Sequence, residues 1–114
     1  MIKMMNRFGF AFHGLRVAVR QTSLRIHLFF VVCVTAAGLL LDLTAAEWCA
    51  LILSMALVVA LEIVNTAIEE TVDFISPGRD ERAGRIKDIA AAAVLVAALA
   101  SVVIGAVIFL PKII

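Results

Sequence analysis

The sequence predicts an all-α membrane protein made of three membrane-spanning helices and one amphipathic helix at the membrane surface. Of the 114 residues, 64% are hydrophobic and the mean hydropathy is +1.12, whereas a soluble domain is about half apolar. Three long apolar segments follow one another, and most charges lie before or between them. The net charge of +1 gives no electrostatic reason to expect nucleic-acid binding.

The three spans are expected over residues 24–41, 48–75 and 81–110 of a single domain, residues 1–114. In the third, the stretch Ile89–Leu110 has no charge, and about 20 apolar residues are enough to cross a hydrocarbon core of about 30 Å. The first span is not followed by a small-residue cleavage site and a soluble domain, so we expect it to be retained rather than removed as a signal peptide.

An amphipathic surface helix is expected over residues 3–22. Phe8, Phe12, Leu15 and Val19 recur at helical spacing and form an apolar stripe, with arginines roughly opposite. Such a helix is typical of the membrane interface. Phe10 projects toward the polar side, where it either packs on a neighbouring helix or presents a flat surface to a planar ligand.

The distribution of Lys and Arg predicts the orientation of the chain in the membrane. The N-terminal segment is basic, and the connection between the second and third spans carries Arg79, Arg82, Arg85 and Lys87. The connection between the first two spans, residues 42–47, is short and acidic. The positive-inside rule therefore places the N-terminus in the cytoplasm and the C-terminus outside.

The most informative feature is a polar stripe in the second span, which we define as Glu62, Asn65, Glu69 and Asp73. At about 100° per residue these positions fall within roughly 80° of one another on one helix face. A charge at the centre of a bilayer costs on the order of 2.5–3.5 kcal/mol. Because no cation lies near Glu62 in the sequence, we predict that it is a functional residue.

The polar stripe runs from lipid toward water. If Trp48 marks the outer interface, Glu62 lies about 21 Å further along the helix and Glu69 about 31 Å, at the cytoplasmic surface. A reaction between a lipid headgroup and a water-soluble molecule would need this layout. Three spans and a surface helix bury such a stripe poorly within one chain, so a homo-oligomer is expected.

Lys87 and Asp88 precede the apolar run of the third span and complete a set of residues that suits phosphoryl transfer. Carboxylates bind Mg²⁺, a lysine contacts phosphate oxygens, and a carboxylate base takes the proton of an attacking hydroxyl. The structural alternative is a set of ion pairs that hold helices together, such as Lys87 with Asp73. The absence of a Walker loop or Gly-rich phosphate loop excludes ordinary kinase folds.

Two motifs of the chain resemble the small prokaryotic diacylglycerol kinase and undecaprenol kinase family. They are the Glu-x-x-Asn-x-x-x-Glu-x-x-x-Asp array of the polar stripe and the Lys87-Asp88 pair before an Ala-rich apolar helix. The segments Leu24-Arg-Ile-His27 and Ser76-Pro77 are more similar to its Gram-positive-type undecaprenol kinase branch. The resemblance runs from about Phe8 to the C-terminus.

The resemblance implies an ATP-dependent lipid kinase of the cytoplasmic membrane that phosphorylates undecaprenol or diacylglycerol. It implies a homotrimer with active sites between subunits, Glu62 as general base, and Glu69 as a ligand of the Mg²⁺ on ATP, supported by Asn65 and Asp73. The residues that it places around the nucleotide are Phe10, Gln21, Glu69, Gly78, Arg79, Asp80, Lys87 and Asp88.

Three positions depart from the family pattern. Gln21 stands six residues before His27, where the family commonly has a second metal-binding glutamate. An amide oxygen can bind Mg²⁺ but contributes no charge. Phe10 stands where the family usually has a tyrosine near the adenine, and Asp80 where the undecaprenol branch usually has a histidine.

Two other classes of protein are the alternatives. A proton-coupled small multidrug transporter has a similar size and one intramembrane glutamate, but it would have four spans with the glutamate near mid-membrane in the first. A purely structural membrane subunit is the other alternative, and the buried charge of Glu62 argues against it.

Overall fold

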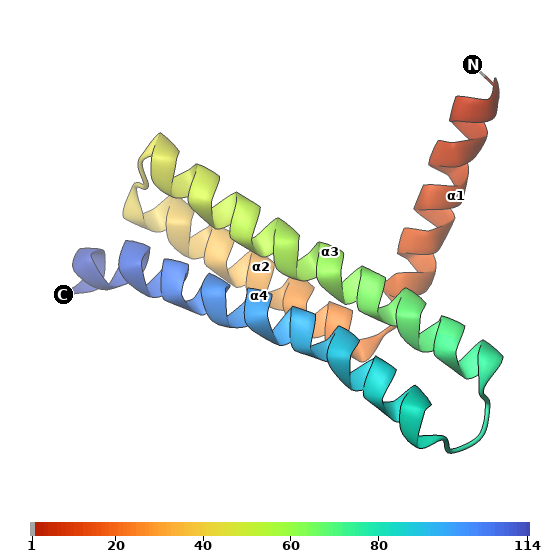
Figure 1. Ribbon diagram of the computed structural model, residues 1–114. Coiled ribbons are helices and arrows are strands. Elements are labelled where there is room, and N and C mark those ends of the chain that lie inside the picture. The colour runs from red at the N-terminus through yellow and green to blue at the C-terminus, as the bar shows by residue number, and fades with distance from the viewer. Residues whose placement is uncertain (1) are drawn as a thin grey trace.

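The apolar and amphipathic segments form four α-helices in a computed structural model, which describes residues 2–114 (Figure 1). The helices are α1 (Ile2–Ala18), α2 (Thr22–Leu41), α3 (Ala45–Ile75) and α4 (Glu81–Ile113). Helices α2, α3 and α4 run alongside one another in alternating directions. Each of these three is long and apolar enough to cross a membrane, as the sequence predicts.

The helix pair α2–α3 is joined by a short turn at the end of the bundle opposite the α3–α4 connection. Asp42 ends α2 in the left-handed conformation, with φ of 59°, which Asp tolerates better than most residues. Thr44 then caps α3: its Oγ1 accepts from the Glu47 N–H at 3.2 Å, and the Glu47 carboxylate accepts from the Thr44 N–H at 2.9 Å. This capping box begins α3 at Ala45, three residues before the expected span.

The opposite ends of α3 and α4 are joined by a second connection, residues 76–80, in which Pro77 and Gly78 end α3. Asp80 starts α4 by accepting a hydrogen bond from the Arg82 N–H at 2.8 Å. At its other end α4 continues through Pro111 to Ile113. There Lys112 lies 3.2 Å from the Glu47 carboxylate and ties the last turn of α4 to the first turn of α3.

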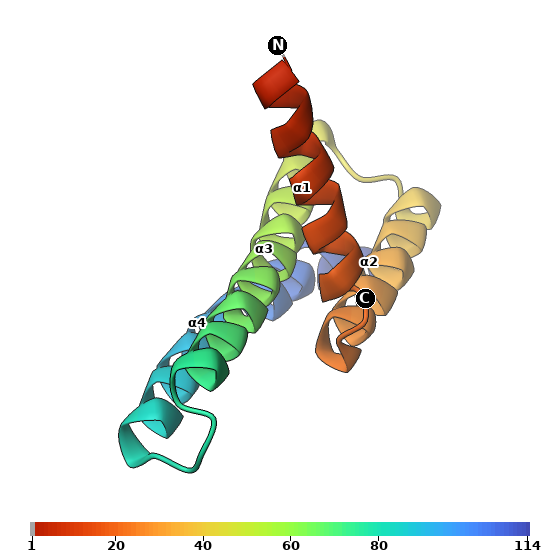
Figure 2. The same cartoon turned by 90° about the vertical axis from the view of Figure 1, so that its right-hand side faces the viewer.

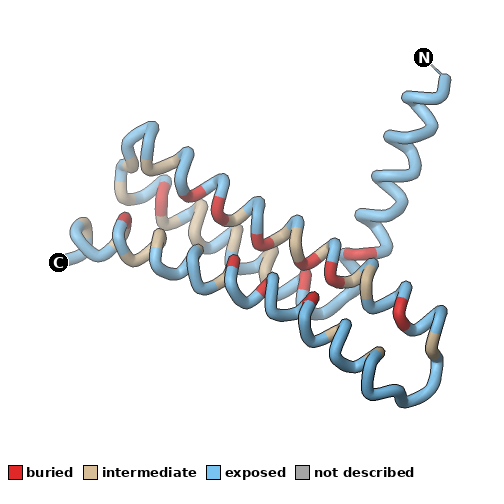
Figure 3. The backbone as a smooth tube through the Cα atoms, viewed as in Figure 1, coloured by how far each residue is buried: buried red, intermediate tan, exposed pale blue. Residues whose placement is uncertain are grey.

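Packing within the chain is centred on α3. Helices α3 and α4 form the closest pair, and α2 also contacts α3; Figure 2 shows α2 to one side of the α3–α4 pair. Buried residues follow the inner face of α3, while most of the bundle surface is exposed (Figure 3). Exposed apolar side chains are abundant on α2 and α4, among them Phe29, Val96 and Val102. A surface of this kind suits lipid or further protein rather than water.

Helix α1 projects away from the bundle, near the end where α3 and α4 are connected (Figure 1). It ends at Ala18, four residues before the expected limit of residue 22, because residues 19–21 form a turn closed by the bonds Arg20 N–H to Val17 O and Gln21 N–H to Ala18 O. The Arg25 side chain fixes this turn by donating to Val19 O at 2.9 Å. Every residue from Ile2 to Val17 is exposed, so nothing in the described chain covers its apolar stripe.

Candidate functional site

The polar stripe of α3 crosses from the buried interior of the bundle to its exposed end. Glu62 and Asn65 are buried, with 6% and 7% of their surfaces exposed, whereas Glu69 and Asp73 are exposed. Because α3 is one uninterrupted helix from Ala45 to Ile75, it carries all four side chains on a rigid element. One end of the stripe is therefore desolvated and the other open to solvent.

The Glu62 carboxylate lies close to a polar side chain from another helix. The Nδ1 atom of His27, on α2, lies 3.4 Å from Oε2 of Glu62. That nitrogen is buried and makes no hydrogen bond within the described chain. Its distance of 3.4 Å from the Glu62 oxygen is longer than a normal N–H···O hydrogen bond. Thr66 bonds only the backbone carbonyl of Glu62, at 3.1 Å. The buried carboxylate thus lies beside an imidazole nitrogen that has no other hydrogen-bond partner among the described residues.

One turn further along α3, Asn65 orients Glu69. The amide Nδ2 of Asn65 donates to Oε1 of Glu69 at 2.7 Å, a spacing of i to i+4. Its amide oxygen, Oδ1, is buried and has no hydrogen-bond partner among residues 2–114. The opposite amide orientation would place that oxygen against the carboxylate, so the hydrogen bond assigns Nδ2 to Glu69. This leaves a buried acceptor beside the exposed end of the stripe.

Asp73 and Lys87 form an ion pair between α3 and α4, the structural alternative raised by the sequence. Their side chains are 62% and 36% exposed, and exposed pairs contribute only about 0–1 kcal/mol. Lys87 can therefore exchange Asp73 for another anion at little cost.

The α3–α4 turn pocket, a hollow of about 420 Å³, lies beside this ion pair. Four of the residues expected to contact the nucleotide line it, namely Gly78, Arg79, Asp80 and Lys87. Arg79 and Lys87 supply positive charge there, and Arg suits bidentate contacts with phosphate. The structure thus gathers half of the expected nucleotide residues into one hollow.

The remaining expected residues are not gathered there. Phe10 lies on α1 with 75% of its surface exposed, Gln21 is exposed at the start of α2 with no side-chain capping bond, and Asp88 is exposed on α4. No hydrogen bond joins Gln21 to Glu69 within residues 2–114. Within one chain, Phe10, Gln21 and Asp88 do not line the pocket, and their contact with the nucleotide stays a prediction.

The donor set near Glu69 fits a nucleotide-bound Mg²⁺ better than a free metal ion. In the part of the chain that the structure describes, no three His, Cys, Asp or Glu side chains gather into a metal cluster. Mg²⁺ commonly takes one or two protein carboxylates together with substrate phosphates and waters. Glu69 offers one such carboxylate, and the unpartnered Oδ1 of Asn65 offers a neutral oxygen beside it.

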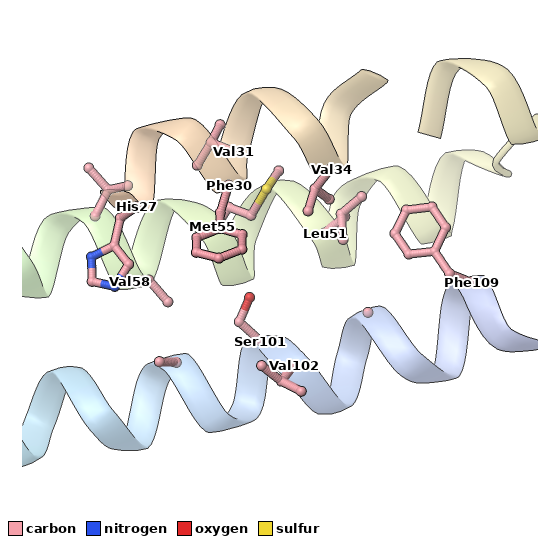
Figure 4. Close-up of a pocket in the computed structure, with 13 residues that line it drawn as sticks. His27, Phe30, Val31, Val34, Leu51, Met55, Val58, Ser101, Val102 and Phe109 are labelled. Atoms are coloured by element: carbon pink, nitrogen blue, oxygen red, sulfur yellow. The ribbon is translucent and has the colours of Figure 1, made fainter. Parts of the chain in front are cut away.

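Beyond Glu62 toward the α2–α3 turn, an apolar cavity of about 320 Å³ lies between α2, α3 and α4. His27 lies at one end of it and Phe109 at the other, with Met55 and Phe30 between them (Figure 4). Sequence reasoning missed His27 as a site residue. Its signal was available: a titratable side chain in an apolar segment, on the helix that must pack against the one carrying Glu62.

Fold and site together define a small helical membrane protein with a buried carboxylate that adjoins a polar, cation-bearing end. Residues 9–109 match the family model for prokaryotic diacylglycerol kinase, and the chain belongs to that family.

Several curated relatives agree with this assignment. A diacylglycerol kinase of Synechocystis is 42% identical over 91% of this chain and 61% of its own length. An undecaprenol kinase of Bacillus subtilis is 39% identical over 81% of this chain and 75% of its own. A diacylglycerol kinase of Escherichia coli K12 is 36% identical over 83% and 79%. The chain thus spans about three fifths of the Synechocystis relative, three quarters of the Bacillus relative and four fifths of the Escherichia relative.

Proposed function

We propose that this chain is a lipid kinase of the cytoplasmic membrane, which transfers the γ-phosphate of ATP to the hydroxyl of undecaprenol or diacylglycerol. The observation that carries the proposal is the buried carboxylate of Glu62 on the same helix face as the solvent-exposed Glu69. A hydroxyl held in lipid and a phosphate donor held in water can meet only at such a boundary. The names of the relatives, diacylglycerol kinase and undecaprenol kinase, support the same reaction.

In this reaction Glu62 is the general base. Its burial in an apolar helix surrounds the carboxylate with little competing water, and a base within reach of a hydroxyl takes the proton as the oxygen attacks phosphorus. The new bond joins the lipid oxygen to the γ-phosphorus, the bond to the β-phosphate oxygen breaks, and ADP leaves with that electron pair. Asn65 holds Glu69 in place during this step.

The nucleotide is proposed to lie over the α3–α4 turn. Arg79 and Lys87 contact phosphate oxygens, while Gly78, Asp80 and Asp88 complete the site. Bound Mg²⁺ supplies neutralisation of the phosphate charge, and Glu69, with Gln21 as a second donor, would hold it. Phe10 of α1 presents an exposed aromatic face of the kind that stacks on an adenine ring.

We propose a homotrimer, as the family resemblance implies, with its N-terminus in the cytoplasm and its C-terminus outside, as the distribution of Lys and Arg predicts. Helix α1 carries its apolar stripe uncovered, and we propose that this helix lies in the membrane interface. From there Phe10 and Gln21 would reach the α3–α4 turn of a neighbouring subunit. A site shared between two subunits would explain why Phe10 and Gln21 lie away from the other site residues within one chain.

The direct test is phosphate transfer by the purified protein in mixed micelles, with γ-labelled ATP and either undecaprenol or diacylglycerol. Glu62→Gln should lower the rate on the order of 10²–10⁴-fold, the usual loss for a general base. Glu70→Gln is the matched control, because it makes the same chemical change at an exposed position next to the stripe, and it should retain activity.

Each outcome separates the candidate functions. Label in one lipid alone would identify the acceptor. No label in either lipid, together with proton-coupled uptake of cationic dyes into proteoliposomes, would favour the transporter. Equal activity of Glu62→Gln and wild type would remove Glu62 from the catalytic role while leaving the lipid kinase assignment in place.

A further inference from the structure

His27 and Glu62 are brought together by α2 and α3 although they lie 35 positions apart in the sequence. The separation between His27 Nδ1 and Glu62 Oε2 is 3.4 Å. Both groups are shielded, since Glu62 is 6% exposed and Nδ1 of His27 is buried. Within residues 2–114 no other side chain bonds this carboxylate.

A buried carboxylate needs hydrogen bonds to hold one orientation, and unsatisfied buried polar groups are costly. Histidine donates from Nδ1 when that nitrogen carries the hydrogen. The observed 3.4 Å is longer than the ordinary 2.7–3.2 Å for an N–H···O bond. Catalytic hydrogen bonds are often long without substrate and shorten in the reacting complex, and a small rotation of either side chain would close this one.

We propose that His27 is a positioning residue for the general base, a role that rests on the proposed lipid kinase function. Nδ1–H of His27 donates to Oε2 of Glu62, which fixes the carboxylate and leaves its other oxygen to take the proton of the lipid hydroxyl. The proton moves to Glu62 as the lipid oxygen bonds to the γ-phosphorus and ADP departs. His27 itself neither gains nor loses a proton in this step.

The location of His27 gives the contact a second consequence. The imidazole forms one end of the apolar cavity between α2, α3 and α4 (Figure 4). The cavity lining is otherwise apolar except for Ser101, on α4. The imidazole of His27 therefore separates the Glu62 carboxylate from the apolar cavity. Without the imidazole, no hydrogen-bond donor from α2 would hold the carboxylate in one orientation.

The experiment compares His27→Leu, which removes the donor, with His27→Asn, whose amide nitrogen can replace Nδ1. Thr35→Val is the matched control: it removes a polar group from α2 whose hydrogen bond, among the described residues, is only to Val31 O of the same helix, at 2.7 Å. For each variant kcat and both KM values are measured in mixed micelles. His27→Leu should lower kcat on the order of 10–100-fold, as expected for a hydrogen bond to a charged group.

The KM for ATP should not change in His27→Leu, because the imidazole is not part of the nucleotide site. His27→Asn should recover most of the lost kcat, and Thr35→Val should resemble wild type. In a Glu62→Gln background, His27→Leu should cause little further loss, since residues that act as a unit are non-additive. A full additional loss in that background would overturn the proposal.

A spectroscopic readout keeps the inference independent of turnover. The infrared carboxyl band of Glu62 is identified as the band that Glu62→Gln removes. In His27→Leu this band should shift, and in Thr35→Val it should not. Active wild type with an unshifted band and unchanged kcat in His27→Leu would refute the positioning role alone. Wild type that is inactive on every lipid, with a band that still shifts, would refute the lipid kinase proposal while retaining the contact.

Discussion

Of the six glycines, Gly38 is the one at which an added methyl group should destabilise the fold most. Gly38 is buried in α2 against the start of α3. A Cβ placed there would lie 2.7 Å from Cη2 of Trp48 and 3.0 Å from Cδ1 of Leu43. Carbon atoms pack at about 3.5–4.0 Å, so either the indole or the helix must move. The short turn of residues 42–44 joins the two helices just beyond this contact and limits that movement.

The expected cost of Gly38→Ala follows from two opposing terms. Overpacking a filled site costs about 1–3 kcal/mol, whereas replacing Gly by Ala inside a helix gains up to about 1 kcal/mol. Gly105→Ala measures the second term alone, because among the described residues, apart from the surrounding turn of α4 itself, nothing lies within 4 Å of a Cβ at that position. Gly38→Ala should therefore be less stable than Gly105→Ala by about 1–3 kcal/mol.

The assay is unfolding in dodecyl maltoside micelles by added sodium dodecyl sulfate, followed by far-ultraviolet circular dichroism. Trp48→Phe removes the two indole carbons that the methyl group would meet, Cη2 and Cζ2. In that background Gly38→Ala should lose most of its penalty, and the double-mutant cycle gives the coupling. Equal stability of Gly38→Ala and Gly105→Ala, or the same penalty with Phe at position 48, would refute this account of the contact.

Three further predictions concern metal binding and capping. Glu69→Ala should raise the ATP concentration needed for half-maximal rate at limiting Mg²⁺, with Glu70→Ala as control; equal affinities would show that Glu69 does not hold the metal. Gln21→Glu should lower the half-saturating Mg²⁺ concentration, since the added anionic donor outweighs repulsion from Glu69 once the cation is bound, and an unchanged or higher requirement would mean that Gln21 does not face the metal. Thr44→Ala should cost about 1 kcal/mol of stability by removing the cap of α3, and Thr44→Ser, which keeps the hydroxyl, should cost much less; an unaffected alanine variant would contradict the capping role.

The three spans and the polar stripe could be predicted because both depend on local pattern. Apolar length alone indicates a membrane span, and helical period alone places Glu62 and Asn65 on one face. The start of α3 at Ala45 could have been predicted as well, although the expected span began at residue 48, because Thr44-Ala-Ala-Glu47 is a capping-box sequence. These features need no knowledge of which helices become neighbours.

The contacts between helices could not be predicted, because sequence period does not say which faces meet. The contact of His27 with Glu62 joins α2 to α3, and the packing of Gly38 against Trp48 depends on how closely the same two helices approach. The sequence allowed two roles for Lys87: an ion pair with Asp73, or contact with phosphate. In the structure Lys87 pairs with Asp73 and also lines the α3–α4 turn pocket, so the two roles are compatible.

The two ends of the bundle differ in how completely the chain satisfies its own polar groups. At the end with the α2–α3 turn, Thr44 and Glu47 cap α3 reciprocally and Lys112 pairs with Glu47. At the other end, Oδ1 of Asn65 has no partner in the described chain and Glu69 is exposed.

Natural sequences depart from local consistency mainly at functional sites. The contacts at the α2–α3 turn therefore stabilise the fold, and the polar groups without partners at the opposite end are those that lipid, nucleotide or a second subunit would complete. On this argument, substitutions at the α2–α3 turn should change stability with little effect on kcat. Substitutions along the polar stripe should change kcat or nucleotide affinity with little effect on unfolding.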